Sequence, residues 1–143
     1  MKSQALWMRL RDEEWNDYEV STGSAQRLEK VLQDLASRKR ARSMRACHEV
    51  WKLLCNGGVR SAAVVAVPYL VDIIDISTKD VQMEIADIIK DCAAGVGRVE
   101  DEWAEDLKKT LLIDKSAIQA LLKRAKGDLE IAYASCLDAI DAL

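Results

Sequence analysis

The sequence predicts an all-α protein, and three observations support this expectation. Half of its 143 residues are apolar, so a single domain of this length buries a substantial core without disulfides or metals. Only one proline and six glycines interrupt a composition that favours helix. Apolar residues also recur at i, i+3, i+4 and i+7 through most of the chain, the spacing of one helix face.

A first pair of helices is expected within residues 24–57. The first helix has an apolar stripe over residues 28–35 and begins at Ser24, whose hydroxyl is a preferred N-cap. A basic connector follows, and the stripe over residues 44–54 predicts the second helix. Asn56, Gly57 and Gly58 end that helix because they readily adopt left-handed conformations.

A second pair is expected over residues 59–95. The segment 59–76 is apolar nearly all round, which indicates burial between neighbours. Pro68 begins or kinks a helix, so we expect a short helical turn over residues 61–66 and a main helix from Pro68 to about Asp75. Ser77 or Thr78 then caps a further helix that ends at Gly95.

The remaining segments are expected to extend and close the stack. Residues 103–112 suggest one helix and residues 118–125 another, capped at Asp114. A last helix, with Asp128 as its N-cap, closes the C-terminal end. At the other end, residues 1–20 form a capping segment in which Trp7, Leu10, Trp15 and Tyr18 cover the first pair. Residues 21–143 form the helical repeat domain.

An internal repeat supports this arrangement. A shift of 38 positions aligns residues 30–35 with residues 68–73, and residues 49–52 with residues 87–90. Helix pairs that repeat about every 40 residues are typical of HEAT and armadillo solenoids, in which each pair buries its face against the next. The sequence therefore predicts an α-α solenoid of about three helix pairs plus a closing helix.

Charge is distributed unevenly. Residues 1–57 carry 11 basic and 8 acidic groups, whereas residues 58–143 carry 10 and 16. On the expected helix after Thr78, four acidic residues recur on one face, opposite the apolar stripe: Asp80, Glu84, Asp87 and Asp91. Like charges at this spacing destabilise a helix slightly, so an unmixed sign permits two interpretations, a solvated face and a partner-binding face.

Further partner-binding candidates lie outside that stripe. Asp72 and Asp75, on the preceding helix, continue its negative sign. Trp103 lies among acidic neighbours and is either a core residue or a half-exposed interface anchor. Arg42 and Arg45 belong to the basic cluster that starts at Arg38, and that cluster is either a solvated connector or a contact surface. Trp51 lies within its apolar stripe and is expected in the core.

The sequence gives no sign of catalytic chemistry. It has no nucleophile-base motif, no phosphate loop and no metal-ligand cluster, so we expect neither an enzyme nor a cofactor. Four widely spaced cysteines are expected to be reduced, each as a small buried side chain, with a reactive thiol as the alternative. Without a signal-peptide core or an apolar run of membrane-spanning length, we expect a cytoplasmic protein that does not contact the membrane.

Part of the chain is similar to a known family. The matching residues run from Trp15, Tyr18, Gly23, Ser24 and Ala25 through Leu32, Leu35, Trp51 and Gly57 to Val59, Ala62, Ala63, Ala66, Val67, Pro68, Leu70 and Ile73. This order resembles that of bacterial HEAT-repeat proteins with a Trp and Gly-x-Ala start and an Ala-Val-Pro-hydrophobic-Leu helix. Cys55 and Asn56 stand where that family usually has His and Gln, and the likeness covers residues 15–75.

The resemblance implies a function. Members of this family frequently accompany polymorphic toxins, so the chain is expected to be an immunity protein that binds and neutralises a cognate toxin domain. A general HEAT-repeat scaffold or adaptor is an alternative that would use the same surfaces. A nucleic-acid-binding protein that uses residues 38–45 is a further alternative, which the overall acidity disfavours.

Overall fold

The computed structural model describes residues 5–143, which form seven α-helices and one 3-10 helix with no strand in that part of the chain. In chain order the elements are α1 (Leu6–Asp12), η1 (Trp15–Asp17), α2 (Arg27–Leu35), α3 (Arg40–Cys55), α4 (Ala63–Ile74), α5 (Lys79–Val96), α6 (Glu102–Arg124) and α7 (Asp128–Asp141). The prediction of an all-α protein is confirmed. None of the described helices combines the length and apolarity needed to cross a membrane. Residues 1–4 of the expected capping segment lie outside the described residues.

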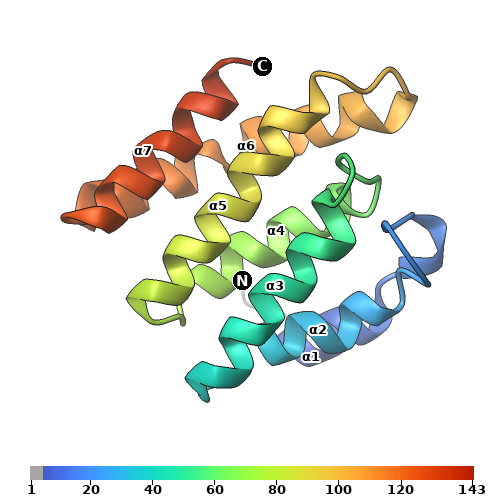
Figure 1. Cartoon of the computed structure of the whole chain (residues 1–143), viewed down its shortest axis with the longest axis horizontal. Coiled ribbons are helices and arrows are strands. Elements are labelled where there is room, and N and C mark those ends of the chain that lie inside the picture. Colours follow the sequence, from blue (N-terminus) through green and yellow to red (C-terminus); the bar gives the residue numbers. More distant parts are fainter. Residues whose placement is uncertain (1–4) are drawn as a thin grey trace.

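The helices form two layers. α3, α5 and α7 lie side by side in one layer, and α2, α4 and α6 form the other behind it (Figure 1). Each helix of the second layer packs against the next helix along the chain, which gives the three pairs α2/α3, α4/α5 and α6/α7. The 38-residue offset of the sequence places α2 within α4 and nearly all of α3 within α5. The sequence repeat therefore maps the two helices of the first pair onto the two helices of the second.

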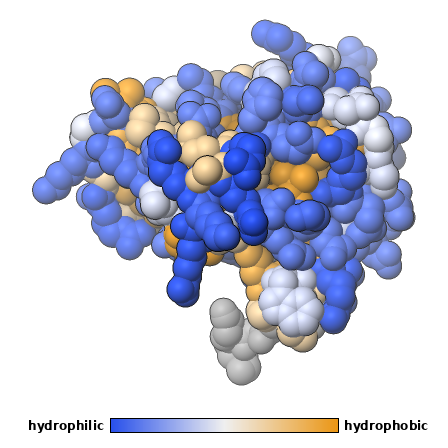
Figure 2. Space-filling view, turned by 60° about the horizontal axis from the view of Figure 1, so that its bottom comes forward, coloured by the Kyte–Doolittle hydropathy of each residue, from blue (hydrophilic) through white to orange (hydrophobic). Residues whose placement is uncertain are grey.

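The core lies between the two layers. Val50 and Leu54 of α3, Leu70 of α4 and Ile85 and Ile89 of α5 are all fully buried. Burial of such a side chain contributes about 1.5–3 kcal/mol, so the layers are held chiefly by apolar contact. Hydrophilic side chains cover most of the face in Figure 2, with apolar atoms visible in smaller patches between them.

Several helix ends lie where the sequence predicted them. α3 ends at Cys55, and the next two glycines adopt positive φ angles, +78° at Gly57 and +126° at Gly58. α5 begins after Thr78, where the Asp80 carboxylate accepts the backbone N–H of Val81 at 3.0 Å. The last helix also lies where it was expected, but Asp128 is its first residue and not its cap, because Gly127 at φ +65° occupies the N-cap position.

The expected break before Pro68 is wrong. α4 is one helix over Ala63–Ile74, and Pro68 lies inside it instead of beginning it. A proline in this position leaves the carbonyl of Val64 without its helical N–H partner. Burial outweighs that loss, because residues on both sides of the proline, including Val67 and Leu70, are fully buried between neighbouring helices.

The expected division of the third unit is also wrong. α6 runs without interruption over Glu102–Arg124, so Asp114 lies within a helix and caps nothing. One continuous apolar stripe of α6 packs on α4 and α7. It includes Leu107 and Leu111, which are fully buried, and Ile118, which is almost fully buried. As a result α7 is the second member of the third pair, and no additional closing helix follows it within the described residues.

The position of Asp114 inside α6 leads to a testable prediction. Its Oδ2 atom is buried without a hydrogen-bond partner among the described residues, and burial, followed by the nearby charge of Asp72, raises the pKa of its carboxyl. We expect Asp114→Ala to increase the free energy of unfolding at neutral pH by about 1 kcal/mol. The variant removes an unpaired half-buried carboxylate and restores helix propensity.

The advantage of this variant should depend on pH. A carboxyl with a raised folded-state pKa stabilises the fold below its unfolded pKa, and this contribution is lost as the pH rises through the folded pKa. The stability advantage of Asp114→Ala over the wild type should therefore shrink as the pH falls toward 3.8, the ordinary pKa of an aspartate carboxyl, and level off below it. Urea denaturation at neutral and acid pH measures the difference, with the exposed Ser116→Ala as a control for propensity. If Asp114→Ala is more stable than the wild type by the same amount at both pH values, the pKa of the Asp114 carboxyl is not raised in the folded protein.

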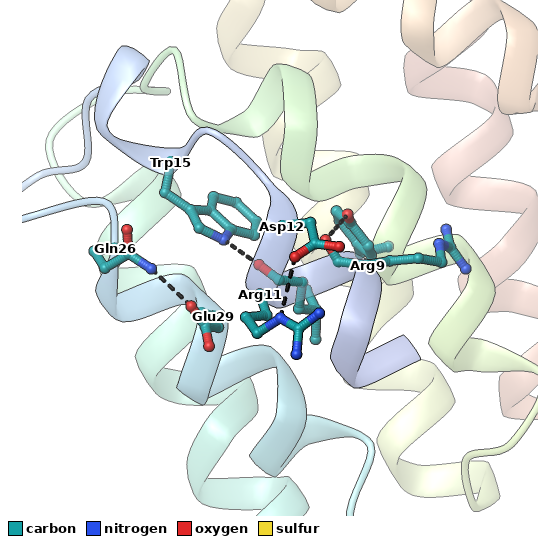
Figure 3. A network of polar contacts seen from close by, with 8 residues as sticks. Arg9, Arg11, Asp12, Trp15, Gln26 and Glu29 are labelled. Carbon is teal, nitrogen blue, oxygen red and sulfur yellow. Dashed lines mark hydrogen bonds and ion pairs between the residues drawn. The ribbon is translucent and has the colours of Figure 1, made fainter. Parts of the chain in front are cut away.

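The N-terminal segment covers one edge of the second layer. α1 packs against α2, and Leu10 and Trp15 are fully buried there, whereas Trp7 keeps 52% of its surface exposed. The indole of Trp15 points back toward α1 and donates its Nε1–H to the carbonyl of Leu10 at 2.8 Å (Figure 3). Of the residues expected to cover the first pair, Leu10 and Trp15 are buried, Tyr18 is partly buried and Trp7 is not.

Candidate partner-binding face

The acidic stripe lies on the outer side of α5, the middle helix of the layer formed by α3, α5 and α7 (Figure 1). Glu84, Asp87 and Asp91 are exposed, and Asp80 is half-exposed at the start of the helix. The apolar residues between these positions, such as Ile85 and Ile88, are buried against the core, so the periodicity of the sequence orients the helix. The stripe therefore faces solvent along the centre of this layer.

Contacts with α3 occupy both ends of the stripe. Arg40 forms an ion pair with Asp80, which also accepts the hydroxyl hydrogen of Thr78 at 2.7 Å. These two contacts, that of Thr78 first, lower the pKa of the Asp80 carboxyl. At the other end, the carboxylate of Asp91 accepts the indole N–H of Trp51 at 2.9 Å. Asp80 and Asp91 thus join the first helix pair to the second.

The centre of the stripe has no such partners. The side chains of Glu84 and Asp87 make no hydrogen bond and no ion pair with any residue in the range 5–143. Partial burial raises the pKa of the Asp87 carboxyl, Lys90 opposes the rise and Asp91 adds to it. Both side chains are nevertheless exposed, so their negative charges remain accessible to cations of another molecule. Glu84 and Asp87 are the candidate contact residues that the geometry favours most.

Asp72 and Asp75 do not join this stripe. Asp72 lies on α4, in the opposite layer, and forms an ion pair with Arg9 of α1 at 2.8 Å. Asp75 follows the end of α4, 4.0 Å from Arg124, beside a cavity of about 270 Å³ between the ends of α4 and α6. These two residues continue the negative sign along the chain but lie apart from the acidic stripe, because the turn from α4 to α5 carries the chain from one layer to the other.

Trp103 lies in the first turn of α6, also in the second layer. It is partly buried against the core, and its indole N–H donates to the Asp101 carboxylate at 3.1 Å. Trp103 is therefore partly buried, between the core residue and the half-exposed anchor that the sequence allowed. It does not share a helix or a layer with Glu84 and Asp87.

Arg42 and Arg45 form a separate site. Both are exposed and line a groove of about 310 Å³ between α2 and α3, together with Lys30, Asp34 and Glu49. Neighbouring ion pairs, such as that from Lys30 to Asp34 at 3.4 Å, mix both signs of charge in this groove. From the basic cluster, Arg40 is the residue that contacts the acidic stripe.

Another groove was not anticipated from the sequence. Trp51, Cys55, Asp91 and Arg98 line a depression of about 260 Å³ between α3 and α5. Trp51 is consequently only partly buried, although it was expected in the core. The sequence did contain a signal for this contact between α3 and α5. Arg40 and Asp80, like Trp51 and Asp91, are 40 residues apart, which is close to the repeat period. Neighbouring pairs of a repeat place equivalent positions side by side.

Within the described residues, no group of three or more His, Cys, Asp and Glu side chains is arranged to hold a metal ion. Comparison of the chain with family models, with curated proteins and with solved structures gives no match.

Proposed function

We propose that this chain is a HEAT-type solenoid that binds a cognate bacterial toxin domain and neutralises it by covering its active surface. The exposed side of α5 makes the central contact, and the chain performs no catalytic step itself. The observation that carries the proposal is the pair Glu84 and Asp87, which lie exposed at the centre of a three-helix layer without an ion pair among residues 5–143.

The arrangement of the helices supports the HEAT-type part of the proposal. Three helix pairs stack so that first helices form one layer and second helices the other. In solenoids of this kind each pair contacts its neighbours, and the stacked helices provide an extended surface for a partner. The 40-residue spacing of the contacts between α3 and α5 agrees with such stacking.

The chemistry of the exposed face indicates the kind of partner. Two exposed carboxylates at i and i+3 complement a basic surface, and complementary charges accelerate association and exclude wrong partners. A toxin domain whose own substrate is anionic, and whose active site is therefore basic, fits this face. The family resemblance over residues 15–75 supports the choice of a toxin over other basic proteins.

A test uses the gene beside the one that encodes this chain. We expect its product to arrest growth when expressed alone and to be harmless when co-expressed with the chain. Deletion of the gene for this chain should be lethal only while the toxin gene is present. If deletion causes the same defect after the neighbouring gene has been removed, the chain is a scaffold or adaptor, and the toxin proposal is wrong.

A further inference from the structure

Two cysteines that lie far apart in the sequence meet at the contact between α3 and α5. Cys55 is the last residue of α3 and Cys92 lies on α5, and their Sγ atoms are 3.6 Å apart. Both thiols are free. The other two cysteines, Cys47 and Cys136, are buried. The pair therefore joins two consecutive helix pairs through a thiol contact.

The two thiols differ in their access to solvent. Cys55 is partly exposed and lines the groove of about 260 Å³ that also contains Trp51 and the cationic side chain of Arg98. Cys92 is fully buried next to it. A small oxidant that enters the groove thus reaches Cys55 first, and Cys92 is the second thiol within reach of the oxidised sulfur.

We propose that Cys55 and Cys92 form a reversible oxidation site that reacts with a peroxide and closes to a disulfide between α3 and α5. In the first step the Cys55 sulfur, having lost its proton, attacks one peroxide oxygen. With hydrogen peroxide the O–O bond breaks, the other oxygen leaves as hydroxide and takes up the proton released by Cys55 to become water, and Cys55 becomes a sulfenic acid. The peroxide is reduced by two electrons and the sulfur is oxidised by two.

In the second step the Cys92 sulfur attacks the sulfur of the sulfenic acid. The S–O bond breaks, and the oxygen leaves as a second water with the proton of Cys92 and its own. The S–S bond is about 2.05 Å long, so the two sulfurs approach each other by roughly 1.5 Å. Cys55 has room for this movement because α3 ends there and the glycines at 57 and 58 follow.

The surroundings of Cys92 disfavour it as the first thiol to react. Its contact with Cys55 and its burial raise the pKa of Cys92 well above the usual value, which disfavours direct attack on an oxidant. Cys47 and Cys136 are similarly protected, because burial raises the pKa of each to about 12. Reaction with a peroxide should therefore begin at Cys55 among the four.

The test is a peroxide titration of the reduced, folded full-length chain, followed by alkylation and mass spectrometry of non-reduced peptides. We expect a single dominant cross-link between the peptides of Cys55 and Cys92, which a thiol reductant reverses. Cys136→Ser is the matched control and should form the same cross-link. Cys55→Ser should remove it and leave Cys92 unmodified, and Cys92→Ser should accumulate a sulfenic acid at Cys55 that dimedone captures.

Circular dichroism of each variant checks that it remains folded, and the comparison of wild type with Cys136→Ser decides the question even if Cys92→Ser unfolds. The proposal is overturned if the wild type cross-links only after denaturation in urea. It is also overturned if Cys92 pairs mainly with Cys136, or if Cys55 proceeds to sulfinic acid equally fast with and without Cys92. None of these results depends on the proposed toxin partner.

Discussion

Replacement of Trp15 by alanine should destabilise the fold by about 3–5 kcal/mol, the largest loss we expect from a single substitution in the N-terminal segment. Trp15 is fully buried and fills the space between α1 and the helices beneath it. Its ring lies 5.9 Å from that of Tyr69 on α4, and its N–H satisfies the carbonyl of Leu10. Alanine would remove the ring contacts, leave a cavity and leave that carbonyl unpaired.

The matched control is Trp7→Ala, on α1 itself, where the side chain is 52% exposed. We expect that variant to cost less than about 1 kcal/mol, since surface substitutions change stability little. Trp15→Phe should fall between the two, because it keeps an aromatic ring but loses the hydrogen bond to Leu10. Urea denaturation followed by circular dichroism measures all three free energies of unfolding. Equal losses for Trp7→Ala and Trp15→Ala would show that α1 and η1 do not anchor to the core as described.

The sequence predicted those helices whose apolar residues fall on one face between recognisable ends. α3, α5 and α7 are of this kind, and the Gly57-Gly58 turn and Thr78 mark boundaries that the structure reproduces. Such local signals suffice because helix ends must satisfy their own backbone groups near the terminus. The start of α2 is instead at Arg27, three residues after Ser24, because the Ser24 hydroxyl accepts the N–H of Gln26 in the turn before the helix.

α4 and α6 were not predictable from local signals alone. The proline in α4 and the aspartate in α6 both disfavour an uninterrupted helix, and local propensity therefore indicated breaks. In each case the helix continues because its apolar residues are buried against helices of other pairs. Leu70 and Leu111, for example, are fully buried in the same core. Tertiary contacts of this kind outweigh a propensity difference of a few kcal/mol.

For the candidate site, the sequence located the stripe on α5 but not the environment of each carboxylate. Spacing alone put Asp80, Glu84, Asp87 and Asp91 on one outward face, which the structure reproduces. Which of the four retain accessible charge depends on contacts with Arg40 and Trp51 from the neighbouring pair. Those contacts require the layer arrangement, and the same arrangement moves Asp72 to the opposite layer.

Reversal of both central charges, Glu84→Lys with Asp87→Lys, should weaken partner binding by at least about tenfold and leave the fold intact. Neither residue has a polar partner among residues 5–143, so the substitution breaks no described contact. It turns the like-charge spacings of residue 84 with Asp80 and of residue 87 with Asp91 into opposite-charge ones, but it keeps 84 and 87 alike and places a lysine beside Lys90, so the net relief is at most a few tenths of a kcal/mol. Thermal stability should therefore be unchanged or slightly higher. Because exposed interface charges act largely on the association rate, the on-rate should fall and lose part of its dependence on salt.

Glu14→Lys with Asp17→Lys is the matched control. Both residues are exposed: Glu14 directly precedes η1 and Asp17 ends it. Neither has a side-chain ion pair with any described residue, and the change in net charge is the same. This control separates a local effect at α5 from a general effect of a less acidic molecule. We expect it to bind the partner as the wild type does, within about twofold, once long-range steering is screened at physiological salt.

The most direct test of the proposed binding face is the affinity of the purified toxin domain for the wild type, the α5 double variant and the η1 double variant, measured by surface plasmon resonance at several salt concentrations. The account predicts a loss of at least about tenfold for the α5 variant alone, mainly in the on-rate. If the α5 variant binds and protects cells as the wild type does, α5 does not form the interface, and the site must be sought at the groove of Arg42 and Arg45 or around Trp103.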